Sequence, residues 1–172
     1  MFLREKMNIK TIDDITLRVA EEKDGSTIFN FIKALAEYEK LSNEVFATEE
    51  QLKKTLFGKA KYAEVVIADY KNQPAGFMLF FHNYSTFLGK PGIYLEDLFV
   101  KPELRGKGIG KILLSYLGKL AVERDCGRIE WAVLDWNEPS IQFYKNLGAV
   151  PMDEWTVFRV TGDKINKLAN MF

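Results

Sequence analysis

The stretch from Tyr94 to Lys111 restricts the fold of this chain more than any other. It reads YLEDLFVKPELRGKGIGK, which is a strand-like apolar run, a short turn, and three glycines within five residues at the start of a helical segment. Glycine has no Cβ, so closely spaced glycines let backbone N–H groups converge. Converging N–H groups in front of a helix attract anions, and the helix dipole adds to the attraction. The sequence therefore predicts a strand, loop and helix that bind a phosphate-bearing ligand.

The spacing of the loop excludes two familiar phosphate motifs. A Walker-type loop ends in Gly-Lys followed by Ser or Thr, whose hydroxyl holds magnesium, but Gly110-Lys111 is followed by Ile112. A dinucleotide fingerprint needs a third glycine five residues after the first, and from Gly106 that position is a lysine. The pattern that remains is Arg-x-x-Gly-x-Gly, which by itself also fits a glycine-rich surface turn. Its basic residues are Arg105, Lys107 and Lys111.

A second informative segment follows the strand-like run further along the chain. Asn137 can accept hydrogen bonds from the free N–H groups of a first helical turn. Pro139 is tolerated only in such a turn, and Gly148 suits the left-handed position that ends a helix. These residues predict a helix that carries Tyr144 and Lys145 on neighbouring parts of one face.

The two segments, in this order and at this separation, resemble the GCN5-related N-acetyltransferase (GNAT) superfamily. Its pyrophosphate loop has the Arg-x-x-Gly-x-Gly form, and its closing helix starts at Asn and carries a Phe-Tyr pair before a Gly-Ala end. Three runs, YLEDLFV at 94–100, WNEPS at 136–140 and LAEYE at 35–39, are similar to the spermidine/spermine N1-acetyltransferase and thialysine acetyltransferase branch. The resemblance extends over about residues 17–167. Phe87 stands where the animal polyamine enzymes have tryptophan, which leaves the amine open.

The resemblance implies an α/β fold with a GNAT-type mixed, mostly antiparallel twisted sheet flanked by helices. Local periodicity agrees, because runs of period two alternate with runs of helical period. The expected strands are 15–19, 62–70, 75–83, 93–100, 128–134 and 155–160. The expected helices are 27–40, 48–58, 111–124, 137–147 and 163–170.

Composition narrows the class of protein. A chain of 172 residues, 47% of them apolar, suits a single domain at 1–172, in which we expect 1–14 to be a mobile N-terminal extension. Its 24 basic and 24 acidic residues predict no nucleic-acid partner and no membrane patch, and no apolar run approaches a membrane span. The single cysteine, Cys126, excludes an internal disulfide and a cysteine zinc cluster. A reducing, cytoplasmic location is therefore expected.

The resemblance assigns acetyl-coenzyme A as the co-substrate and no metal. The only histidine, His82, makes neither a metal site nor a catalytic triad. In the superfamily a bulge on the 93–100 strand leaves backbone groups free for the pantetheine amides. The residues expected to hold the cofactor are Leu98, Phe99, Val100, Arg105, Gly106, Lys107, Gly108, Ile109, Gly110, Lys111, Asn137, Tyr144 and Lys145.

Acetyl transfer needs an uncharged amine and a proton for the leaving sulfur. An alkylamine is mostly protonated at neutral pH, so a carboxylate must take its proton directly or through a water. Glu96 is our choice for the water-mediated base, with Asp97 as a substrate anchor or substitute base. Tyr144 is the candidate acid, because a phenol stays protonated at neutral pH and can protonate a thiolate. Asn137 can hydrogen-bond the pantetheine arm as well as cap its helix.

Acceptor recognition is expected from carboxylates, which attract an alkylammonium, and from aromatic faces, which can hold one. The resemblance gives this role to Tyr38, Glu39, Phe87, Glu96, Asp97 and Trp136. The expected acceptor is a small cationic primary amine: a polyamine, diamine, thialysine-like amino acid or aminoglycoside. The resemblance also implies a homodimer. Two alternatives stay open, namely acetylation of a protein lysine or N-terminus, and a non-catalytic acyl-coenzyme A sensor. A pure binder needs only the loop, so the joint presence of Glu96, Asn137 and Tyr144 argues against a sensor.

Overall fold

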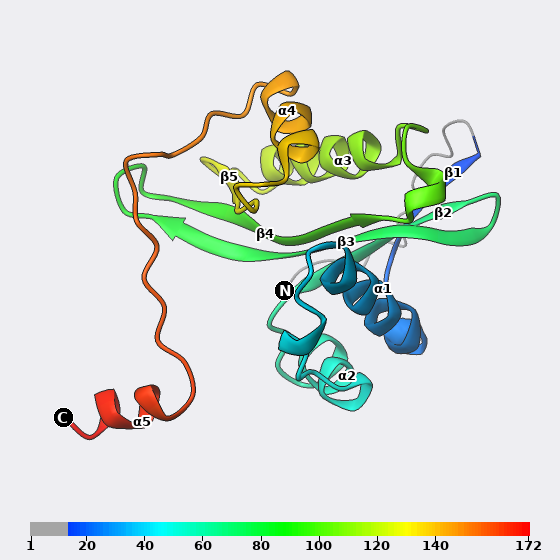
Figure 1. The fold of residues 1–172 in the computed structure, drawn as a ribbon. Helices are drawn as coiled ribbons and strands as arrows, with labels where there is room; N and C mark the ends of the chain where they lie inside the picture. The colour runs from blue at the N-terminus through cyan, green and yellow to red at the C-terminus, as the bar shows by residue number, and fades with distance from the viewer. Residues whose placement is uncertain (1–13) are drawn as a thin grey trace. The chain divides into compact units, whose positions relative to one another are not determined.

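The computed structural model describes residues 14–172, which fall into two compact units, one ending at Ala132 and one running from Val133 to Phe172. Residues 1–13 of the expected extension lie outside the described part. The first unit holds a five-stranded sheet in the order β1-β2-β3-β4-β5 (Figure 1). Neighbouring strands are antiparallel except β5, which runs parallel to β4, so the expected mixed, mostly antiparallel sheet is confirmed. The strands are β1 (Ile15–Val19), β2 (Glu64–Tyr70), β3 (Gln73–Ser85), β4 (Lys90–Val100) and β5 (Ile129–Trp131).

Helices cover both faces of this sheet, with α1 and α2 on one side and α3 on the other (Figure 1). They are α1 (Gly25–Tyr38), α2 (Glu49–Phe57) and α3 (Ile109–Glu123), with short 3-10 turns at Glu22–Asp24, Ser42–Glu44 and Pro102–Leu104. The expected capping box opens α2. Gln51 N–H donates to the Thr48 hydroxyl at 3.2 Å, and the Thr48 N–H donates to the Gln51 side chain at 2.9 Å.

The central strands are buried on both faces because helices lie on both sides. On β2, Val65 and Ile67 face the α1/α2 side, while Val66 and Ala68 face α3. This is the period-two alternation of a strand, with both sets apolar. On the α1 side the Phe31 ring stacks on the Phe77 ring of β3 at 5.4 Å between centroids. The sheet is therefore packed between two apolar cores.

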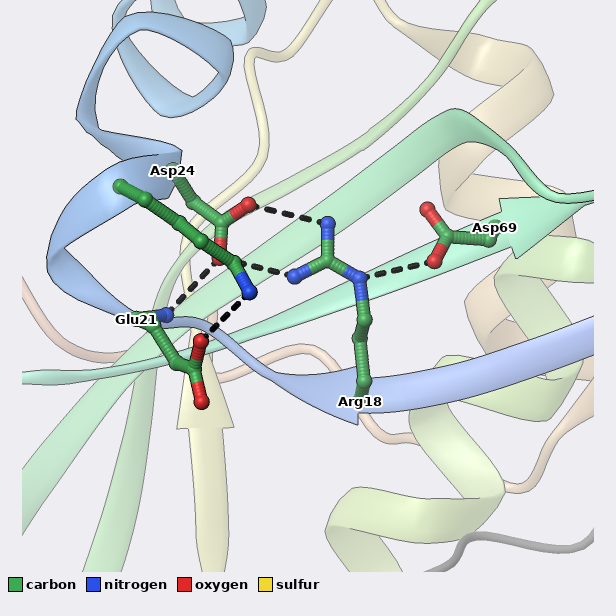
Figure 2. Close-up of polar contacts among 5 residues, drawn as sticks. Arg18, Glu21, Asp24 and Asp69 are labelled. Atoms are coloured by element: carbon green, nitrogen blue, oxygen red, sulfur yellow. Dashed lines mark hydrogen bonds and ion pairs between the residues drawn. The ribbon is translucent and has the colours of Figure 1, made fainter.

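An ionic cluster ties the start of α1 to the sheet (Figure 2). The Arg18 guanidinium of β1 donates to Asp24 at 2.8 Å and, through Nε, to Asp69 of β2 at 2.7 Å. Asp24 also accepts the backbone N–H of Glu21 at 2.8 Å. Burial of Asp24 opposes its charge, but the hydrogen bond from Arg18 helps to hold the pKa of that carboxyl below its ordinary value. The cluster fixes the direction in which α1 leaves β1.

Most expected elements of the first unit are present with bounds shifted by up to three residues, and three differences bear on the argument. The helix expected from Lys111 begins two residues earlier, at Ile109, because Gly108 already takes the left-handed conformation before it. The strand expected over 128–134 stops at Trp131, where its pairing with Leu95 of β4 also ends. The strand expected over 155–160 is absent, since β-forming side chains make a strand only when a neighbouring strand completes the hydrogen-bond ladder.

The second unit contains two helices, α4 (Glu138–Asn146) and α5 (Asp163–Ala169), both close to their expected bounds. Asn137 caps α4 and Pro139 lies in its first turn, as expected. Gly148, just beyond α4, has a φ of 87°, a conformation that favours glycine. Among residues 14–172, no helix combines the length and the apolar character that crossing a membrane requires.

Candidate active site

A bulge on β4 brings two neighbouring carboxylates to the same part of the sheet. Asp97 pairs with Leu79 and Leu95 pairs with Phe80, so Glu96 is an extra residue on its strand. The expected bulge is therefore confirmed. In a regular strand, Glu96 and Asp97 would point to opposite faces, and the bulge relaxes this constraint. Glu96 is exposed, whereas Asp97 is half-buried.

Asp97 is the most perturbed carboxyl of this region. Its burial, followed by the charges of Glu96 and then Glu39, raises its pKa from 3.8 to about 6. Glu39 directly follows α1, and burial raises its pKa as well. The charges of Glu96 and Glu39 both act on Asp97, and we call these three residues the carboxylate cluster. The cluster gathers negative charge at one place, and Asp97 can exchange a proton near pH 6.

Beyond the bulge, the edge of β4 that faces β5 has no partner strand among the described strands of the first unit. Pairing with β5 covers only Ile93–Leu95, while pairing with β3 continues to Val100. No described strand therefore covers the β5-facing edge of residues 96–100, which include Leu98 and Val100. The Val100 carbonyl accepts a hydrogen bond from Arg105 Nε at 3.2 Å. The Lys101 N–H donates to the Ala75 carbonyl of β3 at 2.9 Å, so the alternation of an antiparallel ladder turns the backbone groups of Leu98 and Val100 toward this edge. Phe99 instead has its backbone groups toward β3 and its side chain in the α1-side core.

The glycine loop has the geometry that the sequence predicts. Gly106 and Gly108 have φ values of 79° and 83°, which explains why glycine stands at both positions. Ile109 begins α3 and is buried in the α3-side core, so the loop is anchored directly behind its glycines. Gly110 and Lys111 lie in the first turn of α3, where backbone N–H groups have no partner within the helix. The loop therefore presents N–H groups and three exposed cations.

Two of these cations lie over tyrosine rings. The guanidinium carbon of Arg105 is 4.3 Å from the centroid of the Tyr38 ring, at the end of α1. The Lys107 Nζ is 5.5 Å from the centroid of the Tyr70 ring, at the end of β2. Sequence reasoning gave Tyr38 to the amine channel and did not single out Tyr70. The sequence carries no local signal for either contact, because the partners are far apart along the chain.

The hairpin between β3 and β4 carries Phe87, which sequence reasoning gave to the amine channel. Phe87 is 94% exposed at the tip of this hairpin. Lys90, at the tip end of β4, and Asp97 are seven positions apart, which is about 23 Å at the usual rise of a strand. The structure therefore does not bring Phe87 to the carboxylate cluster.

The remaining candidates belong to the second unit. The Asn137 side chain accepts a hydrogen bond from Ser140 N at 3.4 Å, and its residue is 5% exposed. Tyr144 lies on α4 with its ring 5.4 Å from that of Phe143. Lys145 is exposed, and Trp136 precedes the cap of α4 and is 50% exposed. The roles of these residues toward the first unit stay predictions. Among residues 14–172, no group of three or more His, Cys, Asp or Glu side chains is arranged to hold a metal ion.

A sheet flanked on both faces, a bulged strand with an open edge, and a glycine loop before a helix define the class of acyl-coenzyme A-dependent transferases. Comparisons with known proteins agree. The profile of the acetyltransferase (GNAT) family matches residues 31–149. The chain belongs to this family and is an N-acetyltransferase, and acetyl-coenzyme A is the co-substrate that the family uses.

Individual relatives match over nearly the whole chain. A thialysine N-epsilon-acetyltransferase from Bos taurus is 37% identical over 90% of this chain and 97% of its own. An L-ornithine N5-acetyltransferase from Arabidopsis thaliana is 32% identical over 88% of this chain and 86% of its own. Among solved structures, an integron cassette protein from the mobile metagenome of V. cholerae is 25% identical, with a TM-score of 0.76 over 91% of this chain and 98% of its own. The expected fold and enzyme class are therefore confirmed.

Proposed function

We propose that this enzyme acetylates the primary amine of a small, flexible substrate that carries a second positive charge or an amino-acid head group. The observation that carries the proposal is the carboxylate cluster, where three acidic groups meet and Asp97 has a pKa of about 6. Two relatives support it, since they are named for the side-chain amines of thialysine and ornithine. Polyamines and diamines have the same chemistry: a terminal ammonium linked by a flexible chain to another cation.

The reaction begins with the loss of a proton from the substrate ammonium. A base is most effective when its pKa lies near the working pH. Sequence reasoning favoured Glu96 as this base, with Asp97 as its substitute. The pKa of about 6 now favours Asp97, because this carboxyl is ionised above pH 6 yet still holds a proton well. Glu96 and Glu39 then supply the negative potential that draws the cation in.

The neutral amine next attacks the thioester carbonyl carbon of acetyl-coenzyme A. A bond forms between nitrogen and this carbon, and the nitrogen, now positively charged, gives its second proton to solvent. The carbon–sulfur bond breaks, and the sulfur leaves as a thiolate. We assign Tyr144 as the acid that protonates this sulfur, with Asn137 beside it for the pantetheine arm. The support is chemical: a phenol is protonated at neutral pH, so it has a proton to share with the sulfur as negative charge develops there.

The glycine loop is assigned to the pyrophosphate of the cofactor. Its left-handed Gly106 and Gly108, the start of α3 and the exposed cations support this. The open edge of β4 supports a role for the backbone of Leu98 and Val100 toward the pantetheine amides, since unpaired strand edges accept extended partners. Lys145 is assigned to the cofactor as well, by its position on α4.

We also propose that the enzyme acts as a cytoplasmic homodimer with no nucleic-acid or membrane partner. The support is the resemblance to the family together with the apolar character of residues 150–172, which include Trp155, Phe158 and Phe172. Apolar surface is what contact regions between protein chains bury. A molar mass from light scattering equal to one chain, at micromolar concentration, would exclude the dimer.

A thiol-release assay over a panel of amines tests the acceptor class. The panel should contain thialysine, ornithine, spermidine, a diamine, a monoamine of matched length, a lysine peptide and an aminoglycoside. We expect the compounds with an extra cationic or amino-acid group to give the highest kcat/KM. A lysine peptide as the best acceptor would favour the protein-acetyltransferase alternative. Binding of coenzyme A without thiol release for any amine would favour the sensor.

A further inference from the structure

The side chains of Arg105 and Lys107 are exposed, yet both are held in place. Arg105 is fixed at two points, because Nε donates to the Val100 carbonyl at 3.2 Å and its guanidinium lies 4.3 Å from the centre of the Tyr38 ring. Lys107 has its Nζ 5.5 Å from the centre of the Tyr70 ring, which Lys71 also approaches at 5.5 Å. Tyr38 is the last residue of α1, and Tyr70 is the last residue of β2. The loop is thus supported from two sides of the sheet.

We propose that Tyr38 and Tyr70 are positioning residues for the phosphate loop, an inference that rests on the proposed assignment of this loop to the cofactor. An aromatic face attracts a cation but takes none of its N–H donors. A guanidinium lying on a ring therefore keeps donors in its plane for a phosphate. Long basic side chains normally lose much rotamer freedom when they bind. Cations that are held in advance lose less, so the free enzyme is already arranged for the ligand.

This role separates two neighbouring residues at the end of α1. The Glu39 charge raises the pKa of Asp97, so Glu39 belongs to the acceptor side. The ring of Tyr38 lies against Arg105 of the glycine loop, so Tyr38 belongs with the residues that bind the acetyl donor. We therefore assign Tyr38 to the support of the loop rather than to the amine channel, the role that sequence reasoning gave it.

Calorimetry with coenzyme A alone tests the proposal, because no amine is present to report on an acceptor role. Tyr38→Leu and Tyr70→Leu remove the rings, while Tyr38→Phe and Tyr70→Phe keep them and remove only the hydroxyls. Each Leu variant should raise the Kd by about 2- to 5-fold, the size of one exposed cation–π contact, and each Phe variant should stay within about 2-fold. Tyr62→Leu is the matched control, since Tyr62 is an exposed tyrosine outside the loop.

A double-mutant cycle identifies the partner of each ring. In an Arg105→Ala background, Tyr38→Leu should have no further effect on the Kd, because the cation it supports is gone. An undiminished effect in that background would overturn the proposal for Tyr38. The same cycle with Lys107→Ala tests Tyr70, so a failure of one variant to fold does not remove the test.

Steady-state kinetics adds a readout that lost stability would not mimic. Tyr70→Leu should raise the KM for acetyl-coenzyme A while kcat at saturation stays within about 2-fold. If Tyr38→Leu raises only the KM of the amine and leaves the Kd of coenzyme A unchanged, the positioning role is wrong.

Gly108→Asp distinguishes the assignment of the loop to the cofactor from the assignment of the two tyrosines to the loop. Normal binding by Gly108→Asp and by all Leu variants refutes the loop itself, whereas weak binding by Gly108→Asp alone refutes only the tyrosine supports.

Discussion

Replacing Asp97 by asparagine should raise the free energy of unfolding above that of the parent. This gain should be larger at pH 8 than at pH 4. The folded protein raises the pKa of this carboxyl from 3.8 to about 6. The folded state therefore binds the proton more tightly than the unfolded chain does, and stability falls as pH rises from about 4 to 6. Above pH 6 the loss is complete. Asparagine has nearly the same shape and carries no charge, so it removes this loss.

The magnitude follows from the size of the shift. One pKa unit corresponds to about 1.4 kcal/mol, so a shift of this size gives about 3 kcal/mol at pH 8 and only about 0.5 kcal/mol at pH 4. Partial exposure of Asp97 reduces the difference between the two pH values to about 2 kcal/mol. For a protein of this length, that is about 4–8 °C in Tm.

The assay is thermal unfolding of Asp97→Asn and the parent, side by side at several pH values. Glu103→Gln is the control, because Glu103 is an exposed carboxylate close to the same strand. Its difference from the parent should stay small at every pH. A Tm gap between Asp97→Asn and the parent that does not change between pH 4 and pH 8 would refute the claim that burial perturbs this group. The same variant should lose the rise of kcat/KM near pH 6 that an essential Asp97 carboxylate gives the parent.

Four further outcomes are expected. Tyr144→Phe should lower kcat by about 100-fold while the Kd of coenzyme A hardly changes, and parental turnover would mean that the phenol is not the acid. Gly108→Asp should weaken coenzyme A binding at least about 10-fold in calorimetry, because it puts a side chain and a negative charge at a φ of 83°. Asp24→Asn should lower stability by about 2 kcal/mol at pH 7. Since Arg18 helps to lower the pKa of Asp24, this loss should shrink below pH 4 in urea titrations. The preference for a dication over a monocation in kcat/KM should fall between 50 and 500 mM salt, and a salt-independent preference would contradict the carboxylate cluster as its origin.

The sequence predicted those parts of the fold and site that depend on short stretches of chain. The glycine loop, the capping box at Thr48 and the cap at Asn137 each lie within a few consecutive residues, and the structure has all three. The bulge at Glu96 followed from the family resemblance rather than from local propensity. It is confirmed in the pairing of β4 with β3.

The features that the sequence did not predict depend on partners distant along the chain. Burial of Asp97, followed by the charges of Glu96 and of the distant Glu39, raises its pKa, and no local pattern of Glu-Asp tells which of the two is buried. The early end of β5 reflects the loss of pairing beyond Leu95. Residues 155–160 have strand-forming side chains but form no strand, because strand propensity without a neighbouring strand leaves the backbone irregular. The prediction of a single domain stays a prediction.

The burial of the central strands on both faces has a consequence for protein engineering. A polar or oversized residue at positions such as Ile67 or Phe77 would disrupt a close-packed interior on one side of the sheet. Random libraries spread over the whole chain would therefore lose many members to misfolding. A compact library confined to Glu39, just after α1, and Glu96, at the bulge of β4, leaves both cores untouched. Such a library is the economical route to an enzyme with a different amine preference.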